Sequence, residues 1–187
     1  MMPAPNQQPA PGQRKLLDTR RELSTIPMAA ETGGAGDNVW VYPSEQMFFN
    51  ALRRKNWNAR EEDMQTIVPI HNAVNERAWR EILKWEQMHK TECGQPKLVR
   101  FQGRPKDISP KARILGWLGY TLPFDRHDWV VDRCGKQVTY VIDFYAGQPD
   151  PSRPNAVASF YLDVRPAVSV GGLIDRARRL FQEMTTD

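Results

Sequence analysis

Residues that build metal sites and disulfide scaffolds are scarce in this sequence. Its 187 residues include two cysteines and three histidines. Cys93 and Cys134 lack the short spacing of a structural metal site, and one pair is too few for a disulfide-rich scaffold. The cysteines therefore exclude these two classes of protein, and they leave the redox compartment of the chain open.

Long apolar runs are absent as well. No segment approaches the roughly 18 consecutive apolar residues of a membrane-spanning helix, and the N-terminal stretch has no apolar signal-peptide core. We therefore expect any attachment to a membrane to be peripheral. Phosphate-binding loops, nucleophilic triads and Cys/His metal signatures are also missing, so the common nucleotide-binding and hydrolytic sites are not expected.

Basic residues and prolines, by contrast, are plentiful. The formal net charge is +4, the chain contains 15 prolines, and 40% of its residues are hydrophobic. This composition favours a modest core surrounded by long irregular segments. The mild positive charge favours anionic partners, and nucleic acid, anionic lipid and an anionic cofactor are all compatible with it.

The composition divides the chain into a tail and one domain. Residues 1–38 are predicted to be a flexible tail, because residues 2–12 are polar and proline-rich and residues 31–38 read ETGGAGDN. The folded domain is expected to comprise residues 39–187.

The domain changes its periodicity halfway. Helical spacing and start signals predict helices at residues 43–55, 61–67, 69–90 and 109–118. Segments rich in Val, Ile, Tyr and Phe then predict strands at residues 129–133, 137–145 and 157–164, the first two as a hairpin. A last helix with a continuous apolar face is predicted at residues 170–184. A helical N-terminal half, a small antiparallel sheet and a terminal helix give an α+β fold class.

Among the three histidines, His71 has the most informative position. It shares a helical face with Ile67, Val74, Ala78, Ile82 and Trp85. A titratable ring on an apolar face needs a partner. A haem iron is one such partner, because neutral imidazole is its usual axial ligand. A hydrogen-bonded structural histidine is the alternative.

The other candidates have weaker patterns. His89, near a helix end, is interpreted as structural because a cation there favours the helix dipole. His127 lies in the segment FDRHDW, where an ion-pair corner is favoured over anion binding or proton transfer. Most of the six tryptophans are expected in the core, but Trp40 follows the glycine-rich joint and could cover a flat ligand.

A series of long motifs resembles the holocytochrome c synthase (cytochrome c-type haem lyase) family. The first is WVYPSEQMFFNA at residues 40–51, and the series covers about residues 39–167 in the family's order. The remaining motifs are at residues 70–72 with 75–76, 83–86, 109–113, 119–120, 122–129, 132–135, 140–145 and 162–167. Long ordered motifs of this kind are highly specific, and the proline-rich start of the chain also resembles the family's lead segment.

The resemblance implies an activity and a location. Members of the family join the two cysteines of a CxxCH motif in apocytochrome c to the vinyl groups of ferrous haem b, which is a substrate. They work on the intermembrane-space side of the mitochondrial inner membrane, so peripheral contact with that membrane is expected here. The substrate is expected to be apocytochrome c or cytochrome c1, and no nucleic acid is expected as a partner.

The resemblance also implies site residues. His71 stands where the family places its haem axial ligand, and Trp40 and Glu76 stand at positions important for haem binding. His127 matches the family's second histidine. Our own inference from the sequence adds three arginines that could hold the haem propionates, namely Arg113, Arg126 and Arg133.

Two features of this sequence depart from the family, and other functions stay open. The chain has no Cys-Pro motif near its N-terminus, and its last helix lacks a tryptophan-rich end. The main alternative function is a haem carrier that uses His71 without catalysis. A nucleic-acid-binding module is a weaker alternative, because no recognised binding motif supports it, and a structural subunit of an inner-membrane complex is another.

Overall fold

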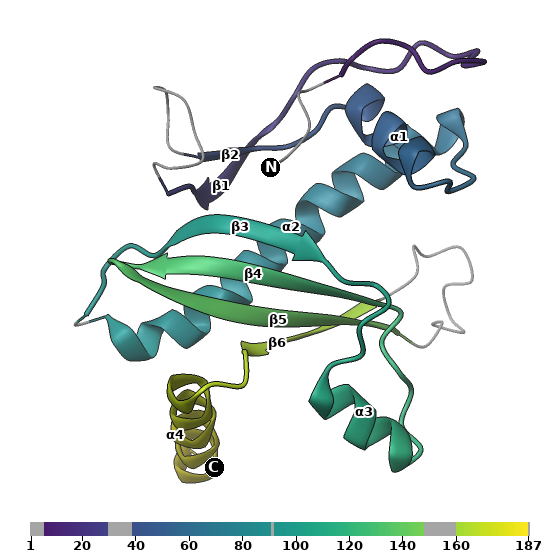
Figure 1. The fold of residues 1–187 in the computed structure, drawn as a ribbon. Coiled ribbons are helices and arrows are strands. Elements are labelled where there is room, and N and C mark those ends of the chain that lie inside the picture. The colour runs from purple at the N-terminus through teal and green to yellow at the C-terminus, as the bar shows by residue number, and fades with distance from the viewer. Residues whose placement is uncertain (1–5, 30–38, 91, 148–159, 187) are drawn as a thin grey trace. The chain divides into compact units, whose positions relative to one another are not determined.

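The computed structural model describes residues 6–29, 39–90, 92–147 and 160–186. It divides into two compact units, which are described separately below. Unit 1 comprises Met1–Ile26 and Asp37–Arg77, and unit 2 comprises Pro27–Gly36 and Ala78–Asp187. The two units share one long helix, whose residues up to Arg77 belong to unit 1 (Figure 1).

Unit 1 combines a two-stranded sheet with helices. Strands β1 (Leu23–Pro27) and β2 (Val39–Val41) pair with each other, and helix α1 (Glu45–Arg54) follows. The helix begins where it does because the Ser44 hydroxyl caps it, accepting a hydrogen bond from the Met47 amide. The core of unit 1 contains a cluster of Leu17, Phe49 and Met64.

Helix α2 runs from Met64 to Glu86 and corrects one sequence prediction. A separate helical segment was expected at residues 61–67 with a new helix starting at Pro69. The structure has only a 3₁₀ turn, η2 (Glu61–Asp63), ahead of a single helix that contains Pro69. Pro69 lies in the second turn, where its ring removes one backbone hydrogen bond but does not end the helix. A second 3₁₀ turn, η3 (Gln87–His89), follows the helix.

Unit 2 is built around a four-stranded antiparallel sheet. Its order is β3 (Lys97–Gly103), β4 (Asp125–Arg133), β5 (Lys136–Ala146) and β6 (Phe160–Pro166), so each strand pairs with its neighbour in sequence. The register sets Trp129 opposite Tyr140 and His127 opposite Ile142. Opposite residues share a face, so these four side chains lie on one side of the sheet.

That face of the sheet carries the core of unit 2. The C-terminal part of α2 crosses it (Figure 1), and the Trp85 indole donates a hydrogen bond of 2.8 Å to the Val164 carbonyl. Trp79, Ile82 and Trp129 are almost completely buried there. Three of the six tryptophans, Trp79, Trp85 and Trp129, are core residues, so the expectation that most would be buried is only half met. Trp57 and Trp117 are exposed, and Trp40 is half-buried.

Helix α3 (Pro110–Trp117) is fixed on the opposite face of the sheet by a buried polar group. The Ser109 hydroxyl caps the helix and donates a hydrogen bond of 2.6 Å to Asp143, which also pairs with Arg165. Helix α4 (Val170–Thr186) follows β6. It contacts β6, and the Arg176 guanidinium donates a hydrogen bond of 3.1 Å to the Pro166 carbonyl.

A disulfide joins Cys93, just after η3, to Cys134 in the turn between β4 and β5. Their Cα atoms are 5.4 Å apart and 41 residues separate them in sequence. The bond connects the end of the α2 segment to the sheet. It was not foreseen in the sequence, because two isolated cysteines carry no pairing signal.

The α+β fold class is confirmed, including the hairpin and the terminal helix. The third strand was predicted at residues 157–164, of which 157–159 lie outside the described residues. Strands β1, β2 and β3 were not predicted. Strand β1 and the buried side chains of Leu17 and Ile26 fall within the predicted tail, while the boundary at residues 38 and 39 stays a prediction.

Candidate functional site

His71 lies on α2 in unit 1, half-buried and in contact with an aromatic ring. The Phe48 ring meets it edge to face, with ring centroids 4.9 Å apart. The Asn75 amide nitrogen lies 3.3 Å from both ring nitrogens and donates a hydrogen bond of 2.8 Å to the His71 carbonyl. The predicted apolar face is only partly present, because Ile67 is exposed while Ala78 and Ile82 are buried.

Asn72 holds the His71 ring from another side. Its side-chain oxygen lies 3.4 Å from Nδ1 of His71. The nitrogen of the same amide donates a hydrogen bond of 2.8 Å to Glu22, which distinguishes the oxygen from the nitrogen. With the proton on Nδ1, Asn72 accepts from the ring, and Nε2 then carries the lone pair that a metal ion requires.

Glu76 lies one turn further along α2 and is fully engaged by hydrogen bonds. Its carboxylate accepts hydrogen bonds from the Thr25 amide at 3.0 Å and the Tyr42 hydroxyl at 2.9 Å, and from the Thr25 hydroxyl as well. Burial raises the pKa of Tyr42 above its usual value, and the hydrogen bond to Glu76 raises it further. Glu76 therefore ties β1 and the residues after β2 to the helix.

Trp40 is the central residue of β2, two residues before Tyr42. Its side chain is half-buried. The Arg21 guanidinium secures this segment by donating hydrogen bonds to the carbonyls of Val41 at 2.8 Å and Tyr42 at 2.9 Å. The position of Trp40 thus depends on the same contacts as that of Tyr42.

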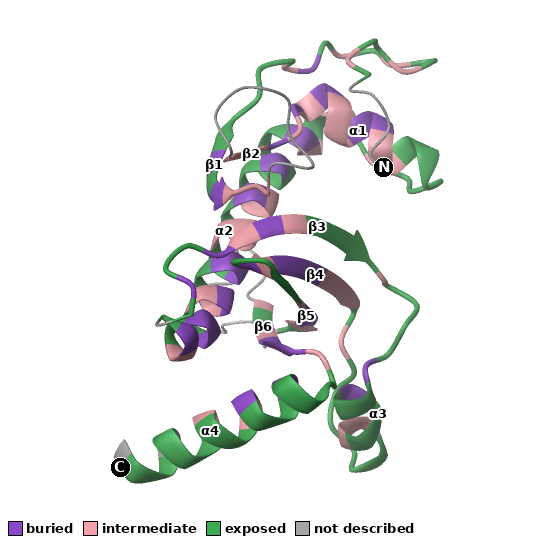
Figure 2. Cartoon of the chain, turned by 60° about the vertical axis from the view of Figure 1, so that its left-hand side comes forward, coloured by how far each residue is buried: buried purple, intermediate pink, exposed green. Residues whose placement is uncertain are grey.

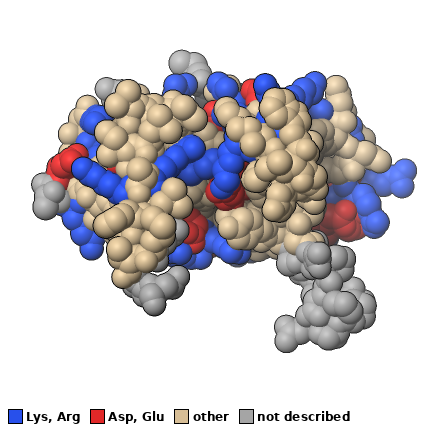
Figure 3. Space-filling model, turned by 90° about the horizontal axis from the view of Figure 1, so that it is seen from below, with Lys and Arg blue, Asp and Glu red and all other residues tan. Residues whose placement is uncertain are grey.

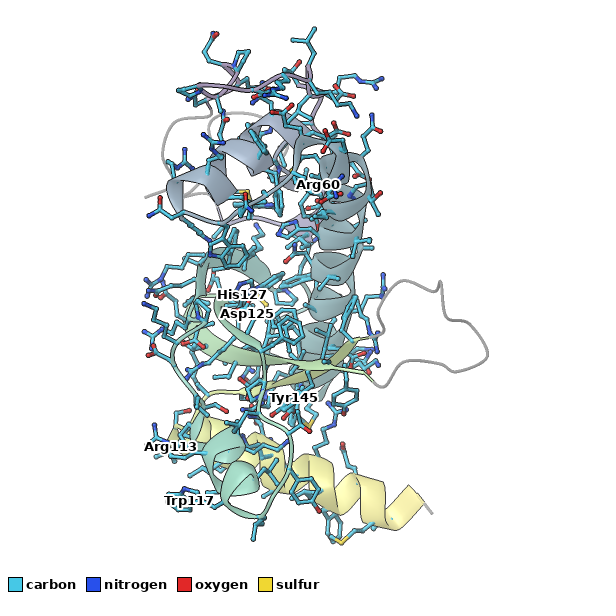
Figure 4. The ribbon with its side chains drawn as sticks, turned by 90° about the vertical axis from the view of Figure 1, so that its right-hand side faces the viewer. Arg60, Arg113, Trp117, Asp125, His127 and Tyr145 are labelled. Carbon is cyan, nitrogen blue, oxygen red and sulfur yellow. A yellow bond between two sulfur atoms is a disulfide. The ribbon has the colours of Figure 1, made fainter. Side chains whose placement is uncertain are left out.

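His127 lies in unit 2 on strand β4, not ahead of the first strand as the sequence suggested. Its Nε2 is 3.4 Å from the Asp125 carboxylate (Figure 4), and its ring contacts Phe144 edge to face at 5.2 Å. The side chains of Asp125 and His127 share one face of the sheet. His127 thus lies beside an acidic side chain, as the structural interpretation of the sequence requires, while its role stays a prediction.

The three candidate arginines, all in unit 2, have different surroundings. Arg133 is buried, and its guanidinium forms two hydrogen bonds of 2.7 and 2.9 Å with the Glu86 carboxylate. Arg126 is mostly buried and pairs with Asp128 at 2.9 Å. Arg113 is exposed on α3 (Figure 4). A propionate would reach Arg133 only by displacing Glu86.

The structure therefore groups the candidates by unit. Trp40, His71 and Glu76 belong to unit 1, and His127 with the three arginines belongs to unit 2. Sequence reasoning missed Asn75, which stands four residues after His71 on the same helical face. It also missed Asn72 and Phe48, for which only the family motifs offered a signal.

A resident metal cluster is not indicated by the described part of the chain. None of its residues form a group of three or more His, Cys, Asp or Glu side chains that could hold a metal ion. Among the described residues, no helix has the length and apolarity needed to cross a bilayer.

Comparisons with known proteins point to one family. The family described as cytochrome c/c1 heme lyase matches residues 1–180. The chain is 52% identical over 189 residues to the holocytochrome c-type synthase of Gallus gallus and 50% identical over 186 residues to that of Homo sapiens. It is 37% identical over 199 residues to the holocytochrome-c synthase of Saccharomyces cerevisiae.

These matches cover most of the chain but less of the relatives. They include 95% of this chain for the chicken and human proteins and 93% for the yeast protein. The chain spans 65% and 66% of the chicken and human proteins and 71% of the yeast protein. No solved structure matches the chain.

Proposed function

The chain belongs to the cytochrome c/c1 heme lyase family, and we propose from this that it is a holocytochrome c synthase. It binds ferrous haem b and an apocytochrome c, or apocytochrome c1, as its two substrates. It forms thioether bonds between the cysteines of the CxxCH motif and the haem vinyl groups. It works in the mitochondrial intermembrane space, in peripheral contact with the inner membrane.

The observation that carries the proposal is the setting of His71. Its imidazole is half-buried against Phe48, and two neutral amides hold it. Both contacts come from neutral side-chain amides, and neutral imidazole is the form that ligates iron. Axial ligation by His71 leaves the other face of the iron to the histidine of the CxxCH motif, which brings both substrate cysteines to the haem edge.

The chemistry asks the protein for positioning more than for a nucleophile. The substrate sulfur forms a bond to one vinyl carbon, the thiol proton ends on the other, and the carbon–carbon double bond becomes single. No electrons leave the two substrates, so no oxidant is needed. Aligning two reactants contributes about 7–11 kcal/mol toward lowering a barrier, which agrees with the absence of a nucleophilic triad from the sequence.

Other side chains are assigned supporting parts in the proposal. Trp40 covers the haem plane, and Glu76 acts through β1 and Tyr42, because its carboxylate is already occupied by three hydrogen bonds. Arg113, Arg126 and His127 stay candidates for propionate or substrate contacts. Arg133 is left out, because it is buried against Glu86.

Co-expression of the chain with an apocytochrome c tests the proposal. The host should lack its own cytochrome c maturation system, and covalent haem is read by staining a denaturing gel. We expect wild type and the exposed α2 variant Arg80→Ala to yield holocytochrome, and His71→Ala to yield none while remaining folded. Haem binding without covalent attachment would instead support the haem-carrier alternative.

A further inference from the structure

Helix α4 is oriented opposite to the usual amphipathic helix of a globular protein. Its polar side faces unit 2: Asp175 is buried and lies 3.0 Å from His89 and 3.7 Å from Arg133. The Arg179 guanidinium stacks over the Trp85 ring at 4.4 Å. Its apolar side chains are exposed instead, namely those of Val170, Leu173, Ile174, Leu180, Phe181 and Met184.

This arrangement is held by specific contacts. Asp175, Arg176 and Arg179, which lie within little more than one turn of the helix, each bind the domain through a polar group. Turning the helix to bury its apolar face would break all three. The exposed face is therefore part of the folded domain of unit 2 and needs another surface to cover it.

Helix α3 and the loop after it expose a second set of apolar side chains. Trp117 has 80% of its surface exposed, more than any other large apolar side chain of this segment. Aromatic and aliphatic residues both contribute to the set, which consists of Ile114, Trp117, Leu118, Tyr120, Leu122 and Phe124.

Both sets lie at one end of unit 2. Helices α3 and α4 project from the same side of the sheet in Figures 1 and 2, and their outer sides are exposed. Figure 3 views this end directly and shows broad areas without charged side chains, with Lys and Arg side chains and fewer Asp and Glu side chains beside and between them. We call the exposed apolar side chains of α3, its loop and α4 the apolar end.

Exposed basic side chains lie on both helices of the apolar end. Arg113 on α3 and Arg178 on α4 are exposed. Arg113 stands four residues before Trp117, so the two side chains share a face of the helix. Among the side chains that are described in α3 and α4, the one acidic group is Asp175, which is buried in its ion pairs. The positive charges of Arg113 and Arg178 therefore complement an anionic partner.

We propose that the apolar end is a membrane-docking surface for a bilayer with anionic lipids. This inference rests on the proposed function only for the identity of the membrane. The apolar side chains enter the boundary between headgroups and acyl chains, while Arg113 and Arg178 contact lipid phosphates. Trp117 and Tyr120 suit this boundary, because aromatic side chains with a polar atom are enriched there.

Vesicle flotation tests the surface with the full chain. Wild type is mixed with phosphatidylcholine vesicles, with and without phosphatidylglycerol, and the bound fraction is measured at several salt concentrations. An apolar double variant, Leu180→Ser/Phe181→Ser, is compared with the matched control Trp57→Ser, an exposed aromatic of unit 1. A charge variant, Arg113→Gln/Arg178→Gln, is compared with Lys136→Gln in the exposed turn of the hairpin.

Each outcome decides for or against the surface. We expect wild type and both controls to bind anionic vesicles in a salt-sensitive manner. The apolar variant should bind at least about tenfold more weakly, and the charge variant about tenfold more weakly on anionic vesicles only. Equal binding of wild type and variants would overturn the proposal, and so would a concentration-dependent dimer that the apolar variant abolishes, since a second copy would then cover the face.

The same proteins separate this proposal from the proposed function. Attachment of haem is assayed in detergent, where docking on a bilayer is not required. The apolar variant, whose residues have no part in the proposed reaction, supports the surface if it loses vesicle binding but still makes holocytochrome in detergent. Wild type that binds vesicles but makes no holocytochrome leaves the surface intact and contradicts the synthase assignment.

Discussion

Asn72 donates a hydrogen bond of 2.8 Å to Glu22, and this bond directs its side-chain oxygen toward Nδ1 of His71. The three residues form a relay in which a carboxylate orients an amide and the amide orients an imidazole. Metal-ligating histidines depend on such partners for their tautomer, and losing the partner costs about 10–100-fold in metal affinity.

We therefore expect Asn72→Leu to weaken haem binding about tenfold or more, although Asn72 need not touch haem. Glu22→Gln keeps an oxygen that accepts the Asn72 hydrogen bond, so it should bind haem almost like wild type. Haem titration with the Soret spectrum as readout measures both variants. A purely structural role would lower the unfolding midpoint of Asn72→Leu but leave the spectrum and affinity of its folded fraction unchanged.

The disulfide between Cys93 and Cys134 closes a loop with a sequence separation of 41 residues. Removing such a cross-link frees the unfolded chain and costs roughly 2–4 kcal/mol in stability. The double variant Cys93→Ser/Cys134→Ser should unfold at lower urea concentration, and reduction of wild type should reproduce that shift.

The same double variant should still attach haem per folded molecule, because the reacting thiols come from the apocytochrome. Changing either CxxCH cysteine of the substrate should remove one thioether. A folded, haem-loaded double variant that makes no holocytochrome would falsify this view and indicate a thiol relay through the enzyme.

Two adjacent glycines at the start of α4 should respond in opposite ways to alanine. A Cβ at Gly172 would meet the Ala167 carbonyl oxygen at 2.2 Å, whereas a Cβ at Gly171 meets nothing within 4 Å. Gly172→Ala should thus destabilise unit 2 by about 1–3 kcal/mol. Gly171→Ala should be neutral or stabilising by up to about 1 kcal/mol, because alanine favours the helix. Thermal unfolding of the pair measures the difference, and equal midpoints would contradict the close packing of α4.

Alkaline pH should destabilise the fold through Tyr140. Burial raises the pKa of Tyr140 above its usual value of 10.0, and the Glu86 carboxylate raises it further. Below pH 10 the phenol is neutral in both states, so its contribution to stability is constant. Above about pH 10 it ionises only in the unfolded chain, and its own contribution to stability falls by about 1.4 kcal/mol per pH unit.

Urea unfolding between pH 8 and 11 measures this loss. Tyr140→Phe should be less stable at pH 8, because its hydrogen bond to Glu86 is lost, but its alkaline slope should be shallower than that of wild type. Tyr161→Phe, at an exposed position, should keep the wild-type slope. Identical slopes for all three proteins would rule out Tyr140 as the cause.

Local periodicity was enough to predict α1, α3, α4 and the β4–β5 hairpin. Their signals are short-range: a serine cap, a proline start, or a turn between two β-branched segments. The position of β1 depends on contacts between residues far apart in sequence, such as Thr25 with Glu76 of α2. No local pattern carries such contacts.

The candidate site residues also divide into those with a local sequence signal and those that depend on contacts with distant segments. His71 could be selected because its side chain is unusual on a helical face. Asn72 and Glu76 could not be given their hydrogen-bonding roles, since their partners Glu22, Thr25 and Tyr42 come from other segments. Arg133 was predicted from the sequence to bind an anion, but in the fold its guanidinium forms an ion pair with the Glu86 carboxylate.

The pairing of Cys93 with Cys134 also has a chemical consequence for the proposed reaction. These are the only cysteines of the chain, and the disulfide leaves neither as a free thiol. A thiol on the enzyme beside a haem vinyl group would be a rival nucleophile, able to capture the haem permanently or to form a mixed disulfide with the incoming CxxCH motif. Because its two cysteines form a disulfide with each other, neither is available to form a thioether with the haem vinyl groups in place of the substrate cysteines.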